Sequence, residues 1–421
     1  MRAGFADLDI TPAPGEELTG YGYYLGRRAT GVLDPLHARA VALEEGGTAA
    51  VIVQLDLIGL TKEFVAGVRA EMTQTAGLAP ENLLLHCTHT HSGPAIVPVE
   101  GCGRPSEQFP ITLREQVLTV IRRALDDLSP VGATTRFSAD WPEGFAWNRT
   151  GGPVLDTHVR GVQIEVEGSL PIAVLSYSCH PVTLGVNKLY SADYCGALLQ
   201  EFSVYGTRAL FLNGCCGDVD PISNAYAWGS GTRETLLIYG RDLARVARQG
   251  MAEATPWKPG PIHGASRAIV LDTEPTSLSE LTASLERLRQ TPADDRTGPQ
   301  RVDIAWHEAM VRRHKEGTVA EAATAEIQAL ACGEVVFVAC SAETFTRLGQ
   351  IIRESAPDHH LLIAATSNGV LGYIGTEDDV RNRGYASMAS CKIYGMALPL
   401  PGAGEQWAKA GAKVVAEAIG G

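Results

Sequence analysis

The sequence contains no apolar run long enough to cross a membrane, and it begins without the apolar segment of a signal peptide. Its 421 residues include no stretch of about 18 apolar residues. The first fifteen, MRAGFADLDITPAPG, mix polar and apolar side chains. We therefore expect no transmembrane helix, no membrane insertion and a cytoplasmic location.

Positive charge is also scarce. The chain has 35 Lys and Arg residues against 48 Asp and Glu, which gives a formal net charge of −13. Binding to nucleic acid or to an anionic membrane depends on basic patches. The charge balance argues against both kinds of partner in general, and it leaves a local basic pocket possible.

The nine cysteines do not form the pattern of a disulfide framework. Their number is odd and no export signal precedes them, whereas disulfide-rich proteins are exported and usually pair all their cysteines. We expect most of them to be small buried hydrophobic residues in a reduced protein.

The hydrophobic pattern predicts an α/β fold. Strand candidates occur at 40–43, 49–60, 82–91, 159–167, 171–180, 208–214, 333–343 and 360–369. Several of them are continuous apolar runs, typical of strands that are covered on both faces. Helical spacing of apolar residues separates them, as at 62–77, 113–128, 196–206 and 235–254. We expect one large domain over 1–421, with mixed β-sheets flanked by helices and a helical excursion at about 276–327.

A histidine-rich motif, HCTHTHSGP at 86–94, ends one of these apolar runs. Side chains alternate between the two faces of a strand, so His89 and His91 are expected to point one way and His86 the other. Two imidazoles at this spacing make a compact metal-binding or acid–base pair. The structural alternative is two unrelated polar residues at a strand end, but the following Gly-Pro turn favours a functional role.

Two further segments with reactive side chains follow other expected strands. His180 lies in SCHPVT, after the run at 171–180, and ligands bind at the carboxyl edge of open α/β sheets. Asp218 and Asp220 lie in NGCCGDVDP at 213–221, where glycines allow a tight turn. These carboxylates suit the role of base, metal ligand or supporting group, while an ordinary loop histidine and an Asp-Pro turn are the structural alternatives.

Three later residues are weaker signals. Glu343 follows the apolar run EVVFVAC, and Tyr373 and Tyr385 lie in glycine-containing turns. An isolated tyrosine more often serves packing than chemistry. These three residues become informative only because they follow the earlier motifs in a particular order along the chain.

In this order, the segments resemble the catalytic domain of the neutral/alkaline ceramidase family. The resemblance runs through most of the chain, and THTHSGP at 88–94 is its most specific part. The other matching segments are ADLDITP at 6–12, TGYG at 19–22, DPLHARA at 34–40, LD at 55–56 and NRT at 148–150.

The resemblance implies a zinc-dependent hydrolase that cleaves an amide bond by metal-activated water. Matched by motif, the zinc ligands are His89, His180, Glu343 and Tyr373. Three further residues match those that line the reacting carbonyl in that family, namely His91, Arg149 and Tyr385. His91 is then the candidate acid.

Two departures from the family pattern change the expected substrate. The family sequence Gly-Asp-Val-Ser-Pro has a serine where this chain has Asp220, so Asp220 becomes a candidate base or a group that orients water. We also expect no counterpart of the β-rich domain that follows the catalytic one in the family. We therefore expect a small or moderately apolar N-acyl substrate rather than ceramide itself.

Other functions remain open from the sequence. An esterase or lactonase would use the same site, because either reaction also begins with attack on a carbonyl. A zinc-binding relative without activity is another alternative. A binuclear amidohydrolase fits less well, since the Ser-Gly-Pro continuation and the late Glu and Tyr differ from its pattern. The sequence identifies neither the substrate nor the oligomeric state.

Overall fold

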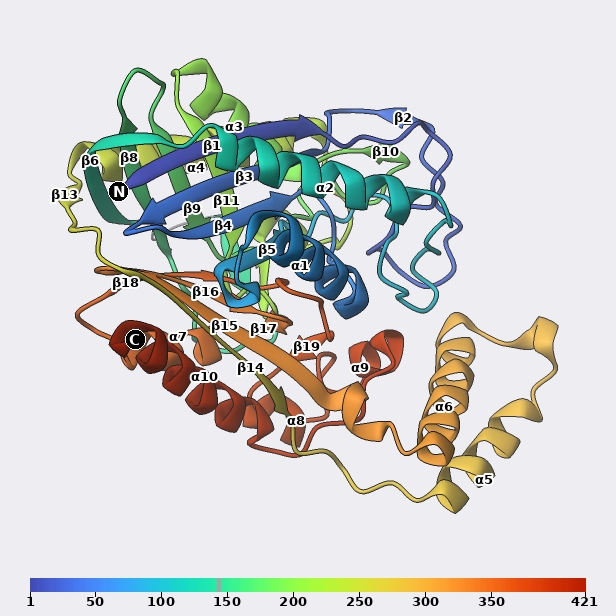
Figure 1. The fold of residues 1–421 in the computed structure, drawn as a ribbon. Helices are drawn as coiled ribbons and strands as arrows, with labels where there is room; N and C mark the ends of the chain where they lie inside the picture. Colours follow the sequence, from blue (N-terminus) through green and yellow to red (C-terminus); the bar gives the residue numbers. More distant parts are fainter. Residues whose placement is uncertain (142–144) are drawn as a thin grey trace.

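The computed structural model describes residues 1–141 and 145–421, which form four layers (Figure 1). A large sheet and a smaller sheet pack face to face, and helices cover the outer face of each. This confirms the predicted class of mixed sheets flanked by helices.

The large sheet is mixed, with the strand order β11-β9-β8-β6-β1-β3-β4-β5 and β13 paired to β6. The edge pairs β4–β5 and β9–β11 are parallel, and the other pairs are antiparallel. Its strands are β1 (Arg2–Asp9), β3 (His37–Glu45), β4 (Thr48–Leu55), β5 (Leu83–Cys87), β6 (Ser129–Asp140), β8 (His158–Val166), β9 (Ile172–Tyr177), β11 (Arg208–Asn213) and β13 (Thr255–Pro256).

The smaller sheet has the order β14-β15-β16-β18, and only its β16–β18 pair is parallel. Its strands are β14 (Ile262–Val270), β15 (Thr324–Cys332), β16 (Val335–Cys340) and β18 (His360–Ala364). Short two-stranded pairs join the loops: β2 (Gly31–Val32) with β10 (Leu189–Tyr190), β7 (Ala146–Asn148) with β12 (Val219–Pro221), and β17 (Glu343–Thr344) with β19 (Tyr373–Ile374).

Four helices cover the large sheet: α1 (Lys62–Ala76), α2 (Phe109–Asp126), α3 (Asp193–Val204) and α4 (Arg233–Ala252). The smaller sheet is covered by α7 (Thr346–Glu354) and α10 (Ala403–Gly420). Between β14 and β15 the chain forms a projecting pair, α5 (Leu278–Arg289) and α6 (Gly298–Glu316) (Figure 1). Two short helices, α8 (Glu377–Arg381) and α9 (Ala389–Tyr394), follow β19. Single 3-10 turns lie at Pro80–Asn82, Ile222–Asn224, Ala293–Asp295 and Val319–Ala323.

The helix expected after Thr61 begins and ends as predicted. The Thr61 hydroxyl accepts a hydrogen bond from the Phe64 backbone N–H at 3.2 Å, which caps the first turn of α1. Gly77 ends the helix at a φ of 67°, a left-handed conformation that glycine adopts without steric cost. The two signals fix the helix between them.

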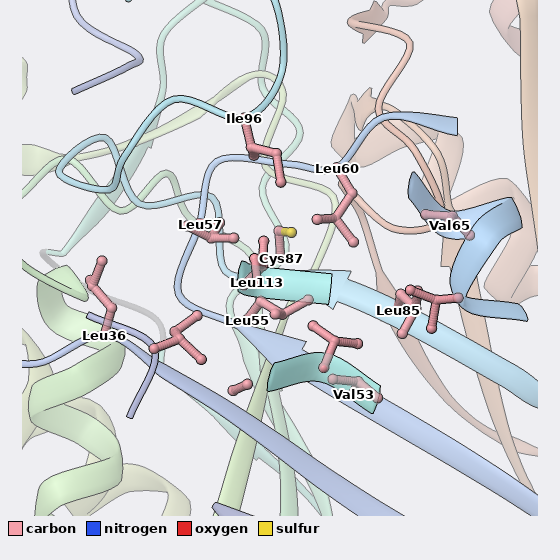
Figure 2. Packing of buried hydrophobic residues seen from close by; sticks show 14 of the residues in the cluster. Leu36, Val53, Leu55, Leu57, Leu60, Val65, Leu85, Cys87, Ile96 and Leu113 are labelled. Atoms are coloured by element: carbon pink, nitrogen blue, oxygen red, sulfur yellow. The ribbon is translucent and has the colours of Figure 1, made fainter. Parts of the chain in front are cut away.

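Burial explains why the strands hold their register. Alternate residues of β4, β5 and β9 face the opposite sheet or the helices, so nearly every residue of these three strands is buried. Figure 2 shows the cluster under the carboxyl ends of β4 and β5, which includes Leu55, Leu85, Cys87 and Leu113. This core supports the loop that carries the histidine motif.

The structure also extends the sequence prediction. It adds the strands β1, β6, β14 and β15, and β15 begins at Thr324, inside the range expected to be helical. All nine cysteines are buried and free, as predicted. Of the helices in the described parts of the chain, none combines the length and apolar character that a membrane-spanning helix needs.

The two edges of the large sheet meet at their carboxyl ends. The strands β5 and β11 lie at opposite ends of the strand order, yet the Asn213 backbone N–H donates to His86 Nε2 at 3.0 Å. The segment after β18 joins both edges, because the Ala365 N–H donates to Asn213 O and the Asn368 N–H to Leu85 O. Loops that leave distant strands therefore converge on one point.

Candidate metal centre

Two histidines stand just beyond the carboxyl ends of strands in the large sheet. His89 follows β5, and His180 follows β9. The φ of His89 is 73°, in the left-handed region that residues other than glycine seldom adopt. Such strain persists where the surroundings over-determine it, and it occurs often at functional sites.

A backbone carbonyl orients each of these two rings. His89 Nδ1 lies 2.7 Å from Ile58 O, and His180 Nδ1 lies 2.7 Å from Cys216 O. A carbonyl oxygen can only accept, so Nδ1 carries a hydrogen and Nε2 is the nitrogen left to face the cluster. A second-site hydrogen bond of this kind is typical of histidines that bind a metal.

Both Nε2 atoms face the carboxylate of Glu343. Its Oε2 lies 3.1 Å from His89 Nε2 and 3.0 Å from His180 Nε2, and all three side chains are 1% exposed. Contacts this short between two Nε2 atoms and an anionic oxygen require positive charge between them, either as protons on the nitrogens or as a bound metal ion. Imidazole nitrogen and carboxylate oxygen are zinc ligands, so the residues present fit a zinc ion.

Electrostatics around Glu343 point the same way. Burial alone would raise the pKa of Glu343, but the charge of His89 and the hydrogen bond from His180 hold that pKa well below its usual range. The carboxyl group is therefore ionised, as a metal ligand must be.

His91 completes a group of three imidazoles whose ligand atoms all lie within 4.8 Å of one another. Its ring centroid is 5.1 Å from that of His89 and 5.7 Å from that of His180. Within residues 1–141 and 145–421, neither of its buried ring nitrogens has a hydrogen-bond partner. Gly20 makes room for the ring, because a Cβ on Gly20 would lie 2.5 Å from His91 Cγ.

The surroundings of His91 keep it neutral. Burial, together with the positive charges of His89 and His180, places the pKa of His91 well below its usual value. A neutral imidazole has one N–H donor and one acceptor nitrogen. His91 is thus able both to hold a proton and to accept one.

The β17–β19 pair brings Tyr373 to the same point. Glu343 and Tyr373 are register partners in these parallel strands. The Tyr373 hydroxyl lies 3.2 Å from His180 Nε2 and accepts a hydrogen bond from Arg149 Nη2 at 2.7 Å. The phenol therefore lies between the histidine cluster and a fixed cation.

The β7–β12 pair brings in Arg149 and Asp220. Arg149 Nη1 donates to Asp220 Oδ1 at 3.2 Å, and its Nη2 donates to Gly217 O at 2.8 Å. Burial alone would lower the pKa of Arg149, but Tyr373 and Asp220 raise it well above its ordinary value. Asp220 also lies near His180, with 3.7 Å between Oδ1 and Nδ1.

A cavity of about 1130 Å³ opens onto this cluster. Tyr385 lines it as a half-exposed side chain, and the guanidinium of Arg149 lies over its ring at 5.8 Å. Trp147 and Trp228 add aromatic surface to the wall. The cavity is large enough for a ligand the size of a drug molecule or larger.

Seven of the eight predicted site residues line this cavity, and the eighth, His180, contacts it through Glu343, with 3.0 Å between Nε2 and Oε2. His86 stays apart from the histidine cluster, as expected, although the reason differs. The strand β5 ends at Cys87, so His89 and His91 lie in the loop and not in an alternating strand. The turn at His89, and not the alternation of a strand, aims both rings inward.

Two residues of the site were not predicted as functional. Asn213 Nδ2 donates to Thr88 O at 3.0 Å, and its Oδ1 accepts from the Cys179 N–H at 3.3 Å. It thereby ties the chain beside His89 to the chain beside His180. The other is Tyr394, whose hydroxyl donates to Glu343 Oε1 at 2.7 Å. Asn213 stands in the noted NGCCGDVDP segment, whereas nothing local marks Tyr394.

Comparison with known proteins identifies the fold. No protein-family model matches the chain, and no curated protein matches it by sequence. Solved structures do match: the fold is that of the neutral ceramidases. Neutral ceramidase from Pseudomonas aeruginosa superposes with a TM-score of 0.76 at 18% identity, covering 99% of this chain and 74% of that one. A structure described as ceramidase complexed with C2 gives a TM-score of 0.77 at 17% identity, with the same coverage.

Proposed function

We propose that this chain is a zinc-dependent hydrolase that cleaves an amide bond of a small or moderately apolar N-acyl substrate. One observation carries the proposal: the buried Nε2 atoms of His89 and His180 face the ionised carboxylate of Glu343 at 3.0–3.1 Å, at the end of an open cavity. The neutral-ceramidase-like fold supports the same reaction class.

Four residues would hold the zinc ion: His89, His180, Glu343 and Tyr373. When bound, zinc would lower the pKa of a water molecule and polarise the substrate carbonyl. The carbonyl acceptors on both Nδ1 atoms keep each imidazole in the tautomer that binds metal.

Arg149 and Tyr385 would face the developing charge of the reacting carbonyl. Arg149 is held by Asp220, Gly217 and Tyr373, so its guanidinium needs no rearrangement when charge develops nearby. A well-placed donor of this kind contributes about 3–4 kcal/mol to catalysis. Tyr385 supplies an O–H donor from the cavity wall.

His91 and Asp220 would handle the protons. His91, which the site keeps neutral, would accept a proton at its unprotonated ring nitrogen and, as imidazolium, would donate a proton to the leaving nitrogen. Asp220 is 1% exposed and accepts from Arg149, which fixes its carboxylate next to the cluster. As a carboxylate it would accept a proton or orient water, and it would not donate as a serine does.

The first test is metal content and activity of the purified protein. We expect about one zinc per chain, and turnover of amides in a panel that also contains esters and lactones. His89→Ala should remove both the zinc and the turnover, because it deletes one ligand from a buried site. Zinc is measured by elemental analysis and turnover by product release.

The matched control is His307→Ala. His307 lies on α6 and bonds Asp303 O, outside the cavity, so this variant should keep zinc and activity. Wild-type protein without stoichiometric zinc would refute the proposal. Turnover of esters or lactones alone would replace the amidase by the esterase alternative.

A further inference from the structure

The two oxygens of Glu343 have different partners. Oε2 faces His89 Nε2 and His180 Nε2 at 3.1 and 3.0 Å. Oε1 accepts the hydrogen bond from the Tyr394 hydroxyl at 2.7 Å. The tyrosine thus occupies one side of the carboxylate and leaves a single oxygen for the histidine cluster.

Packing against the neighbouring backbone fixes the position of the Tyr394 ring. Gly372 has a φ of 133°, and a Cβ there would lie 3.0 Å from Tyr394 Cβ and Cγ. The ring therefore packs on the backbone of Gly372, whose carbonyl accepts from the Glu343 N–H at 2.7 Å. The same short segment holds both partners of the hydrogen bond.

The helix that carries Tyr394 is anchored at both sides. It ends at Gly395 in a left-handed turn with a φ of 67°. Lys392 pairs with Asp303 of α6 at 2.5 Å, and Trp306 Nε1 donates to Met396 O at 2.6 Å. The hydroxyl is consequently held in place by contacts that do not involve the histidines.

The direction of this hydrogen bond follows from the two groups that form it. The Tyr394 phenol donates its hydroxyl hydrogen, and the Glu343 carboxylate oxygen accepts it.

We propose that Tyr394 is a positioning residue of the metal centre: it holds Glu343 through Oε1, so that the carboxylate binds metal through Oε2 alone. This inference rests on the proposed zinc site. Residues that orient metal ligands typically change metal affinity 10–100-fold when they are removed. Tyr394 acts through Glu343 and has no reacting atom as its partner.

The test is the zinc dissociation constant of Tyr394→Phe, measured by competition with a chelator of known affinity. The variant keeps the ring and loses one hydroxyl, and we expect zinc to bind about 10–100-fold more weakly. The matched control is Tyr24→Phe. Tyr24 donates the same kind of bond, to Glu100 Oε1 at 2.6 Å, and lies outside the cavity of the metal centre. The zinc affinity of Tyr24→Phe should remain within about twofold of the wild-type value.

A second measurement, made in the Glu343→Ala variant, separates a positioning role of Tyr394 from a general loss of structure. In Glu343→Ala there is no carboxylate for Tyr394 to hold, so adding Tyr394→Phe should leave the zinc affinity unchanged. An equal loss of affinity in both backgrounds would overturn the proposal, as would a Tyr394→Phe affinity equal to that of Tyr24→Phe. Absence of zinc from the wild type would instead refute the proposed function.

Discussion

Arg149 connects the segments of the site through its hydrogen bonds. Its guanidinium donates to Asp220, to a backbone carbonyl and to the Tyr373 hydroxyl, and it lies over two tyrosine rings. A buried guanidinium with this many partners also holds those partners in place, because the loss of any one of them would leave a buried positive charge partly unpaired, which costs free energy. The position of the Tyr373 phenol beside His180 therefore depends on the negative charge of Asp220.

We predict that Asp220→Asn lowers kcat/KM roughly fivefold or more. The amide still accepts from Arg149, but it replaces a charge-assisted hydrogen bond by a neutral one, a loss of about 1 kcal/mol. If Asp220 also accepts a proton during turnover, the loss in kcat is larger. Steady-state kinetics on the amide found in the substrate panel measures both constants.

Asp156→Asn serves as the comparison for this variant. Asp156 pairs with Arg160 at 2.7 Å and with Arg353 at 3.2 Å, away from the cavity. The Asp156→Asn variant should change the free energy of unfolding and leave kcat/KM unaltered. Turnover that is unchanged in Asp220→Asn would remove Asp220 from the mechanism.

At the scale of the elements, the site depends on the closure of the large sheet. The edge strands β5 and β11 meet through His86, which bonds the Asn213 N–H and also lies 2.9 Å from Ala365 O. Asn213 in turn bonds the chain beside His89 and beside His180. The distance between the two histidines is therefore set by strand edges, not by the loops alone.

His86 should make the stability of the protein sensitive to acid. Burial lowers the pKa of His86 to about 3, whereas an unfolded histidine titrates near 6.5. The unfolded state takes up the proton first, so stability is present above about pH 6.5 and falls as the pH drops towards 3. Between pH 7 and pH 5 this one group should lower the free energy of unfolding by about 2 kcal/mol.

The measurement is the free energy of unfolding at pH 7 and pH 5 for wild type and His86→Gln. The variant should be less stable at pH 7, but it should lose about 2 kcal/mol less between the two values. His158→Gln, at an exposed side chain, should follow the wild type. An equal pH dependence in His86→Gln and wild type would contradict the assignment.

At the scale of the whole molecule, the proposed ligands come from both sheets. His89 and His180 follow strands of the large sheet, while Glu343 and Tyr373 follow strands of the smaller one. A bound metal would therefore link the two layers of the core. Anything that binds only the folded state stabilises it by mass action.

We predict that zinc raises the thermal stability of the whole chain. At a free concentration 100 times the dissociation constant it should add about 2.7 kcal/mol to the free energy of unfolding. Thermal melts of metal-free protein with and without added zinc measure the shift. The His89→Ala variant should show almost none, and a comparable shift in that variant would place the stabilising metal elsewhere.

Strands with long apolar runs, such as β5 and β9, could be predicted from the sequence because both of their faces are buried. The strands β6 and β14 could not, since much of their length is exposed and polar. The same contrast holds at the site. His89 and His91 stand in a dense local motif, whereas Tyr394 reaches Glu343 across 51 residues, a contact that no local pattern records.

The anchoring of α9 to α6 has a consequence for the helical pair that projects from the fold. Under the proposed role of Tyr394, the contacts of Lys392 and Trp306 contribute to the arrangement that favours metal binding. Linkage between two such events is reciprocal, so a bound ion would strengthen the docking of α6 on α9 by the same free energy that this docking adds to metal binding. A segment that lies far from the chemistry would then report, through its own mobility, whether the centre is loaded.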